Sequence, residues 1–190
     1  MILMKGTKGI KESKEMKMNP LIPFVSFTSF HFVPALPQAT LCFFLTADKI
    51  LLAQKKQGFG AGKWNGYGGK VLSDESISAA AVREVKEESG LDVDEKDLKP
   101  VAVNRFYIDG KIKFECSVFV ARRWTAEPQA TREMITPTWY LLSEIPFALM
   151  WPADHLWLPI ILEGKKIRAD IYLDKELQQV EKFSYEEWLC

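Results

Sequence analysis

Three glutamates in one predicted helix, Glu84, Glu87 and Glu88, constrain this chain more than any other feature. Residues three and four apart share one face of an α-helix, so these carboxylates repel one another. A helix that accepts such repulsion usually carries a cation there, and clustered hard oxygen ligands suit Mg²⁺ or Mn²⁺ better than zinc. The alternative is a solvated charged face, on which nearby basic residues offset the glutamates.

The sequence around these glutamates also predicts where the helix begins and ends. We expect a helix over residues 75–89, with Ser73 or Asp74 as its N-cap and Gly90 just beyond its last turn. Arg83 stands four residues before the second glutamate of the three and can orient its carboxylate through a charge-assisted hydrogen bond.

The remaining pattern mixes strands and helices without regular βαβ alternation, which indicates an α+β fold with a mixed sheet. The Asp109-Gly110 dipeptide is typical of a hairpin turn between two strands. The predicted strands are 41–45, 50–53, 101–108, 111–121 and 167–173, and further helices are predicted at 156–162 and 176–182.

Residues 1–38 differ in composition from residues 39–190, which we expect to form the folded domain. The segment is lysine-rich at first and then apolar but interrupted by prolines. It fits a disordered leader or an over-extended start, with Met16 or Met18 as the initiator; a signal peptide is the alternative. Its apolar stretch is too short and too interrupted for a spanning helix, so we expect no membrane insertion.

The charge balance excludes some classes of partner. Lys+Arg and Asp+Glu both number 25, so the net charge is zero, and a general nucleic-acid or anionic-membrane binder needs a positive field. The three cysteines, Cys42, Cys116 and Cys190, lack metal-type spacing and fit a reduced compartment better than a disulfide scaffold. We therefore expect a cytoplasmic protein. We also expect it to be a monomer.

The segment from Gly69 to Leu91 resembles the Nudix box at every defining position, including Glu75 and the run Arg83-Glu84-Val85-Lys86-Glu87-Glu88-Ser89-Gly90. The resemblance implies an α/β/α sandwich that hydrolyses a nucleoside diphosphate linked to another group, with Mg²⁺ or Mn²⁺ as cofactor. In the family, the residues that match Glu84, Glu87 and Glu88 bind the metal, helped by the carbonyl of the residue that matches Gly69.

A second likeness extends beyond the box. The stretches 55–71, 143–147 and 150–152 resemble the MutT branch, which acts on oxidised purine nucleoside triphosphates. This implies a small nucleotide substrate that is split into a nucleoside monophosphate and pyrophosphate. In that branch the residues that match Phe59, Asn65 and Trp151 contact the purine, and those that match Thr40 and Lys55 lie near the pocket floor. An ordinary strand threonine and a surface lysine are the alternatives for the last two.

The general base is left open by the sequence. Glu87, Glu88 or an acid from another loop can take a proton from the attacking water, and Glu133 is the candidate outside the helix. A solvated loop acid is the alternative for Glu133. Two other functions also remain open: a Nudix hydrolase of nucleotide sugars or dinucleoside polyphosphates, and a nucleotide sensor without catalysis.

One position departs from the MutT branch, which carries two consecutive aspartates after its Trp-Pro pair. Here the pair is Ala153-Asp154. Because no second carboxylate competes for its proton, Asp154 is expected to stay ionised at neutral pH and to act only as an acceptor. That favours the N–H donors of a guanine edge over an adenine edge.

Overall fold

In the computed structural model, which describes residues 36–188, strands and helices form three layers. Eight strands make one mixed sheet in the order β3-β2-β1-β5-β4-β7-β8, with β6 paired to β2. The β1–β5 and β4–β7 pairs are parallel and the others antiparallel. The strands are β1 Gln38–Leu45, β2 Lys49–Lys55, β3 Trp64–Asn65, β4 Leu98–Ile108, β5 Lys111–Ala121, β6 Met134–Leu141, β7 Ile167–Leu173 and β8 Val180–Glu187.

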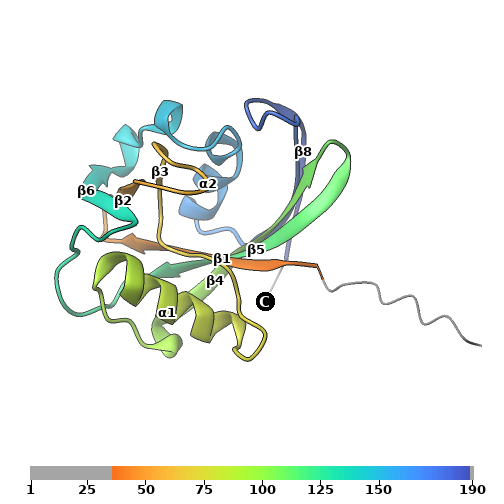
Figure 1. Ribbon diagram of the computed structural model, residues 1–190. Coiled ribbons are helices and arrows are strands. Elements are labelled where there is room, and N and C mark those ends of the chain that lie inside the picture. The colour runs from red at the N-terminus through yellow and green to blue at the C-terminus, as the bar shows by residue number, and fades with distance from the viewer. Residues whose placement is uncertain (1–35, 189–190) are drawn as a thin grey trace, which may run out of the picture. The chain divides into compact units, whose positions relative to one another are not determined.

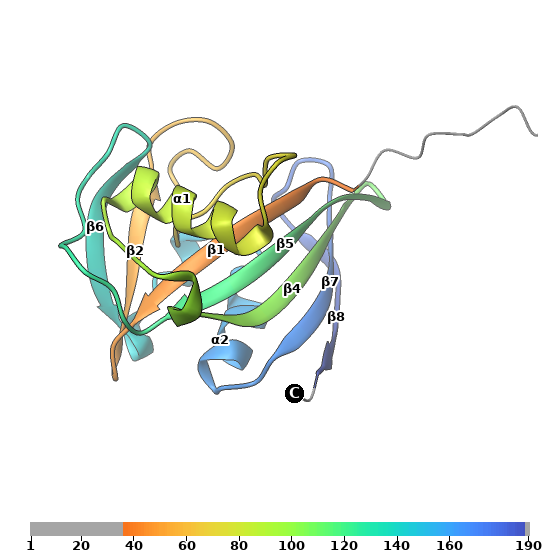
Figure 2. The same cartoon turned by 90° about the horizontal axis from the view of Figure 1, so that it is seen from below.

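Two helices cover opposite faces of this sheet, α1 (Ile77–Ser89) and α2 (Asp154–Leu162) (Figures 1 and 2). Short 3₁₀ turns lie at Glu95–Asp97, Leu142–Glu144 and Phe147–Leu149. Side chains alternate across the sheet, so Phe43 packs with Trp157 of α2 while Phe44 packs with Val85 of α1. The predicted α+β sandwich with a mixed sheet is confirmed.

The first helix begins later than the sequence predicted. Its N-cap is Ser76, whose hydroxyl accepts a hydrogen bond from Ala79 N at 3.1 Å, so the prediction of Ser73 or Asp74 was wrong. Glu75 stays outside the helix because its carboxylate accepts from Leu72 N and from Arg83. The C-terminal prediction is confirmed, since Gly90 has φ +74° and donates its N–H to Lys86 O.

The predicted helix at 176–182 was also wrong. Asp174 Oδ1 accepts from the backbone N–H groups of Gln178 and Gln179, and Leu177 has φ +59°, so the chain turns there. It then enters β8, whose pairing with β7 overrides the helical preference of Glu and Gln. The other predicted strands and the helix near 156–162 are present, whereas β3, β6 and β8 were not predicted.

The proposed leader falls mostly outside the described residues, which begin at residue 36. Within them, Gln38 already belongs to β1, and the carbonyl of Pro37 accepts a hydrogen bond from Glu115 N at 3.0 Å. Among the helices between residues 36 and 188, none has the length and apolar character needed to cross a membrane.

The loop before α1 lies directly on β1. Thr40 N donates to Gly69 O at 2.8 Å, and Cys42 and Tyr67 exchange backbone hydrogen bonds of 2.7 and 3.0 Å. A Cβ at Gly68 would collide with the carbonyl oxygen of Thr40. Glycine is therefore required at Gly68 because of contact with neighbouring backbone, since its φ is not positive.

We predict that Gly68→Ala lowers the free energy of unfolding by at least ~2 kcal/mol, because backbone cannot give way as a side chain can. Gly58→Ala is the matched control: Gly58 has φ +75° and open space around a Cβ, so only the ~1 kcal/mol backbone penalty applies. Urea unfolding of both variants measures the difference, and equal losses would contradict the contact argument.

Candidate active site

Arg83 holds the acidic residues at the start of the site together. Its guanidinium donates to both oxygens of Glu75 at 2.7 and 3.1 Å, to Glu84 Oε1 at 2.8 Å and to Glu87 Oε2 at 3.4 Å. It also donates to the carbonyl of Lys70 at 3.1 Å. The bonds to Glu75, opposed by partial burial, raise the pKa of Arg83, and the cation offsets the repulsion among these carboxylates.

Glu84 lies against the glycine loop. A Cβ at Gly69 would come within 2.5 Å of Glu84 Cδ, so only glycine lets this carboxylate sit beside the loop backbone. Gly69 and the carboxylate of Glu84 are thus adjacent, and the carbonyl of Gly69 accepts a hydrogen bond from Thr40 N at 2.8 Å.

Glu88 is the buried member of the three glutamates. Its Oε1 accepts from Lys55 Nζ at 2.7 Å and its Oε2 from Gly68 N at 2.9 Å. Burial raises the pKa of the Glu88 carboxyl, and its bonds with Lys55 and Gly68 oppose that shift. Burial acts to lower the pKa of Lys55, but the bonds and charges of Glu88 and Glu133 outweigh it and raise that pKa.

Glu133 reaches the same site from the loop before β6. Lys55 Nζ donates to Glu133 Oε2 at 3.0 Å, so one ammonium joins the helix glutamate and the loop glutamate. The structure therefore places Glu133 next to the helix carboxylates, although the sequence separates them by 45 residues or more.

A pocket of about 1180 Å³ collects the predicted residues. It runs from the α1 glutamates across the start of β1 to the beginning of α2. Every predicted site residue except Arg83 lines it: Thr40, Lys55, Phe59, Asn65, Gly69, Glu84, Glu87, Glu88, Glu133, Trp151 and Asp154. Arg83 does not line this pocket but hydrogen-bonds Glu84 and Glu87, which do.

Two aromatic rings form one wall of this pocket. Phe59 and Trp151 stack with centroids 4.8 Å apart at 27°, and Phe59 is 66% exposed. Trp151 lies on the backbone at Gly60, where a Cβ would meet its indole at 2.8 Å. Asn65 Oδ1 accepts from Gly66 N at 2.9 Å, which fixes the amide at the pocket edge.

The ionisation of Asp154 differs from the prediction made from the sequence. It is 4% exposed, and burial raises its pKa to about 7, against hydrogen bonds from Trp151 N and Trp157 Nε1, both 3.1 Å, that lower it. The expectation of a fully ionised carboxylate at neutral pH was wrong, because burial alone does what a second carboxylate was thought necessary to do.

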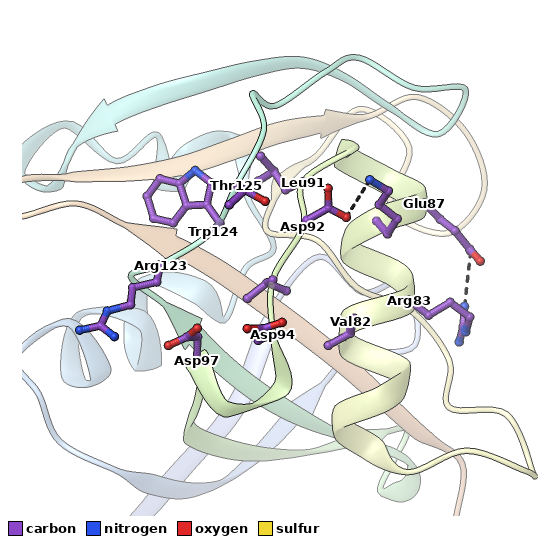
Figure 3. Close-up of a pocket in the computed structure, with 12 residues that line it drawn as sticks. Val82, Arg83, Glu87, Leu91, Asp92, Asp94, Asp97, Arg123, Trp124 and Thr125 are labelled. Carbon is purple, nitrogen blue, oxygen red and sulfur yellow. Dashed lines mark hydrogen bonds and ion pairs between the residues drawn. The ribbon is translucent and has the colours of Figure 1, made fainter.

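A smaller pocket of about 550 Å³ lies between α1 and the segments that follow α1 and β5 (Figure 3). Its lining includes Val82, Leu91 and Trp124, and Asp92 pairs with Lys86 at 2.8 Å at its edge. It shares only Glu87 with the large pocket. Glu87 is 60% exposed in its side chain and thus stands between the two pockets.

The donor set of the large pocket suits a divalent metal ion in its chemistry, because glutamate oxygens and a backbone carbonyl are the hard ligands that Mg²⁺ and Mn²⁺ take. The side chains do not converge on a ready-made centre: within residues 36–188, no three His, Cys, Asp or Glu side chains are grouped to hold an ion. Arg83 and Lys55 instead pair with the glutamates.

Several pocket residues were not anticipated from sequence. Asn104 and Phe106 of β4, Phe114 and Cys116 of β5, and Trp157 of α2 also line it. Their segments were predicted correctly as strands or helix, but no local motif marks which strand faces the pocket. The pairing of β4 with β5 and β7 places the four strand residues there, and the packing of α2 on the sheet places Trp157.

Comparison with known proteins agrees with this fold and site. A family model described as NUDIX domain matches residues 35–187, so the chain belongs to the Nudix family, and it is a hydrolase of that family. Two curated relatives are named oxidized purine nucleoside triphosphate hydrolase. The one from Danio rerio is 39% identical over 75% of this chain and 94% of its own length; the one from Mus musculus is 40% identical over 76% and 96%.

A solved structure shows the same fold. The MutT protein from Bacillus halodurans matches with a TM-score of 0.63 at 23% identity, over 80% of this chain and 98% of that one. At this identity the likeness supports the architecture alone.

We predict that Lys55→Met makes stability strongly dependent on pH. Glu88, 5% exposed in its side chain, would lose its cation, at a cost on the order of ~3 kcal/mol at pH 8. The folded-state pKa of Glu88 lies above its ordinary 4.5, so the deficit should be absent near pH 4 and grow as pH rises through that pKa.

Urea unfolding between pH 4 and pH 8 measures this dependence. The double variant Lys55→Met/Glu88→Gln is the control, since it removes the buried charge and should recover stability at high pH. A Lys55→Met deficit that does not change with pH would contradict the ion-pair assignment.

Proposed function

We propose that this chain hydrolyses oxidised purine nucleoside triphosphates to the monophosphate and pyrophosphate, and so removes damaged nucleotides from the precursor pool. The observation that carries the proposal is one pocket that holds both a carboxylate cluster for phosphate chemistry and an aromatic wall with polar groups for a base. The activity named for the two curated relatives supports the substrate class.

The carboxylate end would take the phosphates. Glu84, Glu87 and Glu88, with the carbonyl of Gly69, would hold Mg²⁺, or Mn²⁺ in its place. A bound divalent ion neutralises phosphate charge and lowers the pKa of a bound water. Arg83 orients Glu84 and Glu87, and Lys55 keeps the buried Glu88 charged and fixed.

In the chemical step a base takes a proton from the attacking water, the water oxygen bonds to one phosphorus, and the bridging P–O bond of that phosphorus breaks to give the monophosphate and pyrophosphate. Both oxygens of Glu88 already accept hydrogen bonds. We therefore assign the base to Glu87 or Glu133, both largely exposed in their side chains and both on the pocket wall.

The aromatic end would take the base. Trp151 offers an indole face for stacking, Asn65 an amide, and Asp154 a carboxyl that is half-protonated near neutral pH. Thr40 Oγ1 is buried, has no hydrogen-bond partner within residues 36–188, and also lines the pocket. We propose a preference for the oxidised guanine substrate, because ionised Asp154 accepts from guanine N–H donors.

The remaining assignments are proposals of the same kind. The buried thiols Cys42 and Cys116 form no disulfide in the part of the chain that the structure describes, which supports a reducing, cytoplasmic location. The zero net charge supports a small nucleotide rather than a nucleic acid as ligand. We also propose that the protein works as a monomer.

We predict that Glu87→Gln lowers kcat at least ~100-fold with little change in melting temperature, since this side chain is exposed and the loss of its ion pair with Arg83 is offset by relief of repulsion from the neighbouring glutamates. Chelation should abolish turnover of the wild type. Glu163→Gln, an exposed acid at the end of α2, is the control.

A Mg²⁺ titration distinguishes the two roles of Glu87. If it binds the metal, high Mg²⁺ should restore part of the activity of Glu87→Gln; if it is the base, the loss should persist. Near-full activity of Glu87→Gln at low Mg²⁺ would contradict both roles.

We predict that base selectivity changes with pH. Above the Asp154 pKa of about 7 the carboxylate only accepts, while below it the acid can donate to adenine N1. The ratio of kcat/KM for oxidised guanine to oxidised adenine triphosphate should therefore rise from pH 6 to pH 8. Proton transfers common to both substrates cancel in this ratio.

Asp154→Asn should make the ratio independent of pH. It should lower kcat/KM for the oxidised guanine substrate more than for the oxidised adenine substrate. Nearby Lys63 lowers the pKa of Asp154. A wild-type ratio that stays flat from pH 6 to pH 8 would refute the role of Asp154 in base choice.

A further inference from the structure

Asn104 is a buried polar residue whose amide oxygen has no hydrogen-bond partner among residues 36–188. It lies in the middle of β4 and is 1% exposed. Ser89, equally buried, bonds Val85 O and Leu91 N, and Asp154 accepts two hydrogen bonds. An unsatisfied buried oxygen costs free energy, so an apolar side chain would stabilise β4 better unless a ligand uses the amide.

The strand register places Asn104 at the base end of the large pocket. It pairs with Cys116 of β5 and Ala169 of β7, on the sheet face that packs against α2. Burial raises the pKa of the Cys116 thiol, and the nearby charge of Asp154 raises that pKa further. Asn104, Cys116 and Asp154 all line the pocket, so the amide belongs to the group around Asp154.

The other orphaned pocket oxygen, Thr40 Oγ1, belongs to the opposite face. Thr40 pairs with Ser117, next in the chain to Cys116, and strand neighbours face opposite sides. Thr40 is therefore on the α1 side, with the glutamates proposed to hold the metal ion at the phosphate end. Asn104 faces away from that charge, toward the part of the pocket that Trp151 and Asp154 would give to the base.

We propose that Asn104 is a specificity-determining residue whose Oδ1 accepts a hydrogen bond from the exocyclic amino group of the bound purine. The proposal rests on the function proposed above. An orphaned acceptor needs a donor, and a guanine edge offers its ring N–H and its 2-amino group. Asp154 accepts a hydrogen bond from the ring N–H, and Asn104 accepts one from the 2-amino group. A purine that lacks the amino group would leave the buried amide unsatisfied and be selected against.

The experiment compares oxidised guanine triphosphate with the oxidised hypoxanthine triphosphate, which differs only by the missing 2-amino group. For the wild type we expect kcat/KM to favour the guanine substrate by ~10- to ~100-fold, since the pocket is open at one end. Asn104→Leu, of similar size, should remove most of this preference. The loss should fall on the guanine substrate and mainly on KM.

Two further measurements separate recognition from a structural role. The melting temperature of Asn104→Leu should equal or exceed that of the wild type, because an unsatisfied polar group is removed. Calorimetry with the oxidised guanine monophosphate alone, without metal, should show weaker binding by a similar factor. Asn104→Ala provides a second test if leucine disturbs β4, and Val103→Ala, on the other face of the same strand, should keep the preference.

The outcomes also separate this proposal from the function on which it rests. If the wild type hydrolyses no purine triphosphate, the proposed function itself is wrong. If it hydrolyses them and both Asn104 variants keep the wild-type preference for the amino purine, the proposal for Asn104 is overturned while the function stands. A lowered melting temperature with unchanged preference would likewise assign Asn104 a purely structural role.

Discussion

The close approach of the glycine loop to β1 is the constraint on which the site depends. Hydrogen bonds from Thr40 N to Gly69 O and between Cys42 and Tyr67 lay the loop on the strand, and a side chain at Gly68 would collide with that backbone. The loop in turn contacts both ends of the carboxylate cluster: Gly69 borders Glu84, and Gly68 N bonds Glu88. The contacts that place α1 over the sheet therefore also fix the positions of its glutamates.

Two cations offset the repulsion among the carboxylates of the acidic helix face. Arg83 joins Glu75, Glu84 and Glu87, and Lys55 joins Glu88 and Glu133. Each cation connects residues from different segments, so the charges fix the loop, the helix and the β6 approach relative to one another. Site geometry and local stability thus share the same ion pairs, which is why the charged residues of this site cannot be varied independently.

The two ends of the pocket differ in how their polar groups are satisfied. At the α1 end the carboxylates are paired with cations and backbone N–H groups. At the α2 end, among residues 36–188, Asp154 is buried with two N–H donors and forms no ion pair, and Asn104 Oδ1 has no hydrogen-bond partner. The first end suits a highly charged phosphate group with its counter-ion, and the second suits the polar edge of a neutral base.

The sequence alone determined the Nudix helix, its glycine C-cap, the carboxylate spacing and most strands, because these follow from local periodicity and local hydrogen bonding. Through its resemblance to a family it also pointed to some of the residues that line the large pocket, although not to those of β4 and β5. It could not fix the start of α1, where Arg83 draws Glu75 out of the helix, nor β8, whose pairing with β7 overrides local preference. Only the tertiary structure decided the ionisation of Asp154 and the place of Asn104. Both depend on burial and strand register, which join residues far apart in the chain.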